Sequence, residues 1–155
     1  MSVPGDPRPG DTRPGDDELG ERLRNALENV SMRGEAALPE LLELYDTAMV
    51  FHDPLAVLSG REAFEAAMRK LLTRSKQLRI SVHDSIQRDE RVVVTWTLYM
   101  TLQRGPELVI EGATHARTRE GRIIYQRDYW DLLGSVMDCV PMASTLYRTL
   151  TARLV

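Results

Sequence analysis

The sequence contains a single cysteine, Cys139, among its 155 residues. One cysteine can form neither an internal disulfide nor a thiolate metal cluster, so the composition suits a reducing cytoplasm. The chain has no run of about 18 apolar residues, the length a membrane-spanning helix needs. Its N-terminus also lacks the apolar core of a signal peptide. We therefore expect neither membrane insertion nor secretion.

An excess of positive charge is also lacking. The net charge is −3 and the isoelectric point is about 5.6, whereas a nucleic-acid-binding protein needs a basic face. The three histidines are widely spaced and form no metal-ligand motif. Glycine-rich phosphate loops and nucleophile elbows are absent too. We expect no nucleic-acid partner and no metal.

The chain is long enough for one domain with a core, because 43% of its residues are hydrophobic and 28% are charged. A Pro-Gly-Asp repeat within residues 4–18 offers almost no side chains for a core, so residues 1–16 are interpreted as a disordered leader. Residues 17–133 form the predicted domain. Residues 134–155 form a predicted helical extension, broken at Pro141.

Three helices are predicted before the main sheet. Leucines at helical spacing indicate the first, over residues 17–31. The second begins near Pro39 and has an apolar stripe that extends to Tyr45. A short strand over 49–53 follows. The sequence Ser59-Gly60-Arg61-Glu62 fits a capping box that starts the third helix.

From Gln77 onward the hydrophobic period changes to two, which predicts a long antiparallel meander. Turns are expected at Asp89-Glu90 and at Gly105-Pro106. The order of elements implies an α+β domain in which the helices pack on one face of a curved antiparallel sheet. Such a domain can enclose an apolar cavity.

The last hairpin contains the most informative residues. If Glu120-Gly121 form its turn, His115 lies opposite Gln126 and roughly 7 Å from Asp128. A bulge at Gly112 would reset the alternation upstream of it. The residues predicted to share one face are Ala113, His115, Ile124, Gln126, Asp128 and Trp130.

Two segments resemble a known superfamily. They are Tyr-Asp-Thr-Ala-Met-Val-Phe-His-Asp-Pro, from Tyr45, with Ser-Gly-Arg-Glu-Ala-Phe after it, and Gly-Arg-Ile-Ile-Tyr-Gln-Arg-Asp-Tyr-Trp-Asp, from Gly121. Over residues 19–133 the chain resembles the nuclear transport factor 2-like superfamily, which includes SnoaL-like polyketide cyclases, ketosteroid isomerase and limonene epoxide hydrolase. The resemblance implies a cone-shaped sheet wrapped by three N-terminal helices, a deep apolar pocket, and dimerisation through the outer sheet surface.

The resemblance also suggests site residues. Asp53 falls where ketosteroid isomerase has its general base, and His115 where that enzyme has an oxyanion-hole acid. The isomerase's tyrosine is missing from residues 27–29. Asp128 matches one member of the epoxide hydrolase triad, whose other two members are missing near Thr97 and Tyr99.

These observations favour a SnoaL-like enzyme without a cofactor, which transfers a proton next to a carbonyl of a hydrophobic cyclic or polyketide-like substrate. Asp53 would remove the proton, His115 would stabilise charge on oxygen, and Asp128 would orient His115 or relay the proton. The predicted substrate contacts are Trp96, Tyr99, Gln126 and Trp130.

Several alternatives stay open. Asp53-Pro54 can simply begin a turn, and His115 can be a strand histidine bonded to a neighbour. The whole protein can be a non-catalytic binder of an apolar ligand or a dimeric partner-binding module. Epoxide hydrolysis with a rearranged set of residues around Asp128 is a third alternative.

Overall fold

The computed structural model describes residues 18–105, 107–131 and 134–135. The predicted leader, residues 1–16, lies outside the described residues. So does the predicted C-terminal helix, apart from Gly134 and Ser135, which are helical. Both assignments stay predictions.

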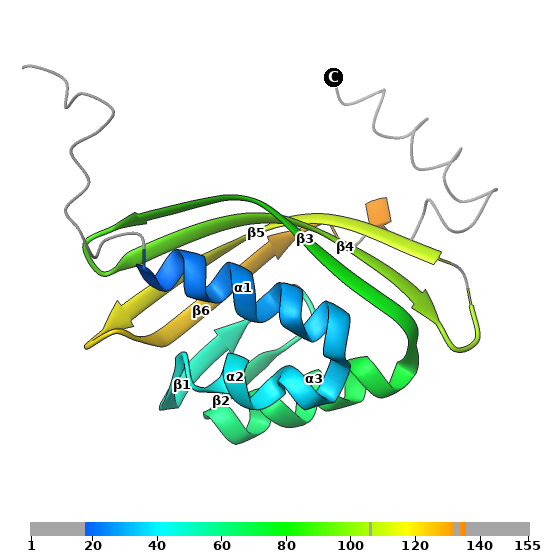
Figure 1. Cartoon of the computed structure of the whole chain (residues 1–155), viewed down its shortest axis with the longest axis horizontal. Coiled ribbons are helices and arrows are strands. Elements are labelled where there is room, and N and C mark those ends of the chain that lie inside the picture. Colours follow the sequence, from blue (N-terminus) through cyan, green and yellow to red (C-terminus); the bar gives the residue numbers. More distant parts are fainter. Residues whose placement is uncertain (1–17, 106, 132–133, 136–155) are drawn as a thin grey trace, which may run out of the picture.

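Two long helices and a six-stranded sheet make up an α+β fold, as predicted (Figure 1). The strands of the meander arch over α1, and α2 and α3 lie on the same side of the sheet (Figure 1). In chain order the elements are α1 (Glu18–Arg33), the 3-10 helix η1 (Gly34–Ala37), α2 (Leu38–Leu42), β1 (Tyr45–His52), β2 (Val57–Ser59), α3 (Arg61–Arg74), β3 (Ser75–Arg88), β4 (Arg91–Leu102), β5 (Glu107–Arg119) and β6 (Arg122–Trp130).

The sheet is mixed, with the order β2-β1-β6-β5-β4-β3. Strands β3 to β6 form the predicted antiparallel meander, but β1 pairs with β6 in parallel. The prediction of a purely antiparallel sheet was therefore wrong. The period-two pattern revealed only pairing between neighbours in the chain, whereas the pairing of Tyr45 with Ile123 joins distant segments.

One stripe of α1 packs against the inner face of the sheet, the face turned toward the helices. Leu23 and Val30 are each 1% exposed in this stripe. They belong to the same core as Val92 and Val94 of β4. The predicted first helix is thus confirmed, and its helical spacing explains why the same side chains are buried.

Two local predictions about the start of elements were wrong. Tyr45 begins β1 instead of ending the second helix. The capping box is also absent: Ser59 pairs with Val50 in the sheet, and Gly60, at φ 88°, precedes α3 without a side-chain cap. Ser59 cannot cap the helix because its backbone is already committed to β2.

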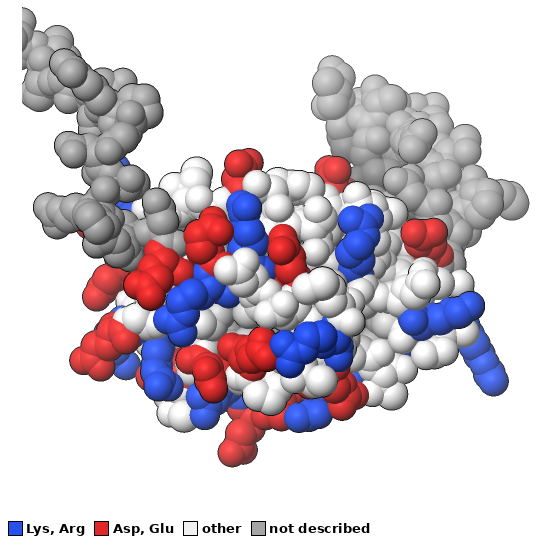
Figure 2. Space-filling view, viewed as in Figure 1, with Lys and Arg blue, Asp and Glu red and all other residues white. Residues whose placement is uncertain are grey.

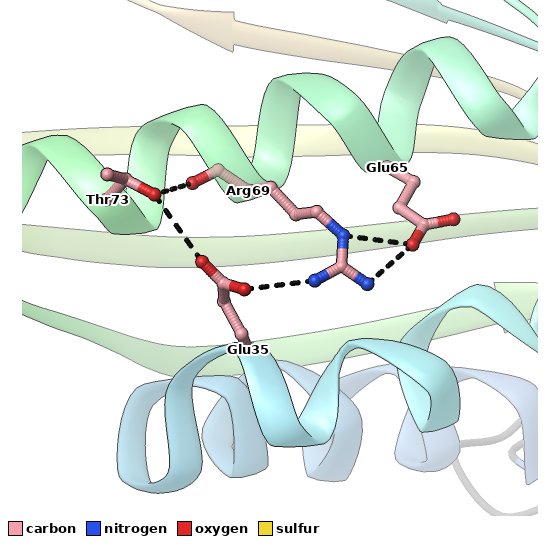
Figure 3. Close-up of polar contacts among 4 residues, drawn as sticks. All are labelled: Glu35, Glu65, Arg69 and Thr73. Atoms are coloured by element: carbon pink, nitrogen blue, oxygen red, sulfur yellow. Dashed lines mark hydrogen bonds and ion pairs between the residues drawn. The ribbon is translucent and has the colours of Figure 1, made fainter.

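The helical side of the molecule has a mixed charge distribution, with acidic and basic side chains interspersed (Figure 2). One contact between η1 and α3 shows this directly (Figure 3). Arg69 bonds Glu35 at 3.0 Å and Glu65 at 2.7 Å, and Thr73 donates to Glu35 at 3.4 Å. These side chains are largely exposed, so the ion pairs add little stability.

Candidate acid site on the inner sheet face

The turn of the last hairpin lies where the sequence predicted it, but the strands are offset by one residue beyond it. Arg119 pairs with Arg122, and both turn residues have positive φ: 51° for Glu120 and 74° for Gly121. The register then shifts between Arg117 and Thr118, which leaves Ile124 as the extra residue. A bulge of this kind moves every later side chain of one strand relative to the other.

The shift overturns the predicted pairing of His115 with Gln126, and with it the predicted diagonal approach of His115 to Asp128. Thr114 now lies opposite Asp128, and His115 lies opposite Arg127. Because successive strand residues point to opposite faces, His115 projects from the outer face, where Val93 is its neighbour. The bulge anticipated at Gly112 lies instead beside Ile123-Ile124, two adjacent hydrophobic residues that interrupt the alternation and could have signalled it.

Asp128 is the centre of a polar cluster on the inner face. The Thr114 hydroxyl donates to its Oδ1 at 2.7 Å, and the Gln126 amide donates to the same atom at 2.9 Å. Burial raises the pKa of Asp128 to about 6, and the charge of Asp53 acts in the same direction, against the lowering effect of the two hydrogen bonds. Asp128 can therefore exchange a proton near neutral pH.

Tyr45 fixes Gln126 from the neighbouring strand. Its hydroxyl donates to Oε1 of Gln126 at 2.7 Å, and the tyrosine is 1% exposed. Burial, and then the charge of Asp128, raise the pKa of Tyr45 above its usual range, so the phenol stays neutral. This role of Tyr45 was not predicted, because the apolar stripe of the second helix was expected to extend to it.

Trp96 fixes Thr114 from the other side. The indole Nε1–H donates to the Thr114 hydroxyl at 2.9 Å. Gly112 lies opposite Trp96 in the sheet, and a Cβ at this position would be 2.5 Å from the indole ring. Glycine is required here because the ring occupies the space of a side chain.

Asp53 has two roles in the structure. Its Oδ1 accepts hydrogen bonds from the backbone amides of Leu55 and Ala56, at 2.8 and 2.7 Å, so it does begin a turn. The parallel pairing of Phe51 with Gln126 also brings Asp53 toward Asp128, whose pKa it raises. The turn and the electrostatic coupling are thus compatible.

Two of the predicted substrate contacts, Trp96 and Gln126, belong to this cluster, and Trp130 shares its face opposite Gly112. Tyr99 does not: it lies on the outer face, where the Arg79 guanidinium is 3.9 Å from its ring centroid. Tyr99 and Trp96 are an odd number of residues apart on one strand, so they point to opposite faces of the sheet. A substrate contact by Tyr99 would therefore lie apart from Asp128 and stays a prediction.

A hollow of about 650 Å³ lies elsewhere, between the end of α1, the end of α3 and the first residues of β3. Val30, Glu35 and Thr73 line it from the helices, and it reaches Arg79 and Tyr99 of the outer face beside β3, the edge strand of the sheet. Its mixed, polar lining differs from the apolar pocket that the sequence suggested, and Asp128 is not among its lining residues.

Within the described residues, no three His, Cys, Asp or Glu side chains gather as a metal site. No helix in this part of the chain is long and apolar enough to cross a membrane.

Residues 23–126 match the model of the SnoaL-like domain. The chain belongs to the SnoaL-like family. No curated protein sequence matches this SnoaL-like chain. Its fold is the nuclear transport factor 2-like, ketosteroid isomerase-like fold, as three solved structures show.

The first of these, provisionally named a SnoaL-like polyketide cyclase, comes from Jannaschia sp. CCS1. It has a TM-score of 0.68 at 17% identity, over 84% of this chain and 97% of the other. An epoxide hydrolase from M. tuberculosis has a TM-score of 0.65 at 15% identity, over 85% of this chain and 94% of the other. A protein with a ketosteroid isomerase-like fold from Catenulispora acidiphila was solved in complex with trimethylamine. It has a TM-score of 0.65 at 18% identity, over 77% of this chain and 92% of the other. At these identities the likeness establishes the fold of the SnoaL-like chain and not its activity.

Proposed function

We propose that this SnoaL-like protein is a cofactor-independent enzyme that moves a proton next to a carbonyl group of a hydrophobic cyclic or polyketide-like substrate. The observation that supports the proposal is a buried carboxyl group, Asp128, whose pKa is raised to about 6 in a cluster of neutral donors. A base with this pKa is ionised at neutral pH and still basic enough to remove a proton from carbon.

In this reaction the Asp128 carboxylate removes the proton from the carbon atom, and the resulting acid returns it to the same or a neighbouring carbon. Asp53 keeps the site negative and thereby favours the protonated form of Asp128. Trp96 and Trp130 supply the apolar surface beside the acid. His115 is not part of this proposal, because it projects from the other face.

The test uses 2-tetralone, a bicyclic ketone with acidic α-protons, in deuterated buffer. Wild-type protein is expected to accelerate α-deuteration, and the rate should rise with pH to a plateau above about 6, where Asp128 is ionised. The Asp128→Asn variant should lose the acceleration. An equal rate in both proteins would contradict the proposed role of Asp128.

Binding without catalysis is the second candidate. The constellations of the two best-known relatives are incomplete in this sequence, and the described hydrogen-bond donors to both carboxylates are neutral: Thr114 and Gln126 for Asp128, and two backbone amides for Asp53. An organic amine would supply the missing positive charge, and the C. acidiphila relative is in complex with trimethylamine. Titration with trimethylammonium chloride should then lower the pKa of Asp128, and Asp53→Asn should weaken the effect.

Epoxide hydrolysis ranks third. Thr97 and Tyr99, near which the missing triad members would fall, belong to the outer face, apart from Asp128. Failure of labelled oxygen from water to enter a diol product would exclude this activity.

Homodimerisation through the outer sheet face is part of the proposal. Large hydrophobic side chains that are 39–65% exposed lie on this face: Ile86, Val93, Val109 and Tyr129. Exposed apolar surface of this kind favours association. Val109→Glu should therefore shift the protein to monomer in sedimentation experiments, whereas Met32→Lys, at an exposed position of α1, should not.

A further inference from the structure

Two chains of hydrogen bonds converge on the same oxygen atom of Asp128. In the first, Trp96 donates to Thr114, and Thr114 donates to Oδ1. In the second, Tyr45 donates to Gln126, and the amide of Gln126 donates to Oδ1. The four side chains of these two chains come from four strands, β1, β4, β5 and β6, so the arrangement depends on the sheet itself.

The chemistry of the first chain fixes its direction. An indole N–H is a donor only, so the Thr114 oxygen must accept from Trp96. The hydroxyl has one hydrogen, which then points to Asp128 at 2.7 Å. Gly112 keeps the indole ring in place, since any Cβ there would collide with it.

The second chain fixes the orientation of an amide. The neutral Tyr45 phenol donates to Oε1 of Gln126, so the amide nitrogen faces Asp128 at 2.9 Å. The opposite orientation would direct the amide oxygen at Oδ1, which already accepts from Thr114, and two acceptors would face each other.

The geometry points to Thr114 and Tyr45 as positioning residues that hold Oδ1 of Asp128 as an acceptor and leave Oδ2 as the atom that gains and loses the proton. An oxygen that accepts two hydrogen bonds is the less basic of the pair, so protonation takes place at Oδ2. This inference rests on the proposed acid-base function for its catalytic meaning, because Oδ2 would be the atom that meets the substrate.

The test measures the pKa of Asp128 in ligand-free protein, so it does not depend on any turnover. The side-chain carboxyl carbon is labelled with carbon-13 and followed by NMR from pH 4 to 8, with Asp128→Asn used to assign the signal. Thr114→Val should raise the pKa by roughly one unit, because a hydrogen bond to the charged form is lost. Tyr45→Phe should raise it less, since Gln126 keeps its amide but loses its anchor.

Two variants serve as controls. Thr114→Ser keeps the hydroxyl and should restore the wild-type pKa. Thr118→Val removes the hydroxyl of another buried threonine on the same face of β5, four residues away, and should leave the pKa unchanged. In Thr114→Val the Trp96 indole proton should also move upfield in the proton spectrum, since its acceptor is gone.

The inference is wrong if Thr114→Val and Tyr45→Phe both leave the pKa of Asp128 within about 0.3 unit of wild type, about a third of the change expected for Thr114→Val. An equal change in Thr118→Val would also overturn it, by showing a general effect of core substitution. If the pKa values change as expected but no ketone is deuterated, the positioning holds and the proposed enzymatic function fails.

Discussion

Both faces of the sheet carry polar side chains that contact one another, but in different environments. On the inner face, Asp128, Thr114 and Gln126 form a closed set of hydrogen bonds beside the core. On the outer face, arginines stack over tyrosines, as Arg117 does over Tyr125 at 4.7 Å. Burial matters on the inner face, because it raises the pKa of Asp128 to about 6.

A shift of register by one residue decides which side chains of β5 can contact Asp128. His115 and Thr114 are neighbours in the chain, yet only Thr114 reaches Asp128. Neighbouring residues of a strand point to opposite faces of the sheet. A bulge shifts the register by one residue, so it changes which residues of one strand share a face with a given residue of the other.

The largest expected effect separates the two faces by activity. Asp128→Asn should reduce ketone deuteration by roughly 10²–10⁴-fold, the usual contribution of a general base. His115→Ala should leave the rate within about twofold, because its side chain lies on the other face. A large loss in His115→Ala would show that the outer face takes part in the chemistry.

The next effect concerns stability and pH. The pKa of Asp128 is about 6 in the folded chain and about 3.9 in an unfolded one, so the folded state binds more protons between these values. The contribution of Asp128 to the free energy of unfolding is therefore greatest below about pH 4. It falls by about 3 kcal/mol in total as the pH rises through about 6. Urea unfolding from pH 4 to 7 should show this decline in wild type. It should be absent in Asp128→Asn, and parallel profiles would contradict it.

Much of the fold could be predicted from the sequence, because periodicity reports burial. The leucine stripe of α1 and the alternation from Gln77 onward predicted the long helix and the meander correctly. The parallel contact of β1 with β6 could not be predicted, since nothing in a local pattern encodes pairing between residues about 75 positions apart.

The candidate site was predicted less well. Asp53, Asp128 and Gln126 were identified and do approach one another. His115 was misplaced, because a single bulge residue, Ile124, reverses the face on which it lies relative to Asp128. Tyr45 was missed, since a tyrosine at the end of a leucine-rich helix pattern looks like part of that helix.

The smallest effect compares two adjacent valines of β4. Val94 faces the core and is fully buried, whereas Val93 is 39% exposed on the outer face. Val94→Ala should lower the free energy of unfolding by about 2 kcal/mol, from lost burial plus the cavity. Val93→Ala should cost less than about 0.5 kcal/mol in the monomer. Both are measured over a range of protein concentrations, so that association through the outer face shows as a concentration-dependent midpoint for Val93→Ala. Equal losses at every concentration would mean that the two faces are equally buried in solution, and the contrast between them would then hold only for the isolated chain.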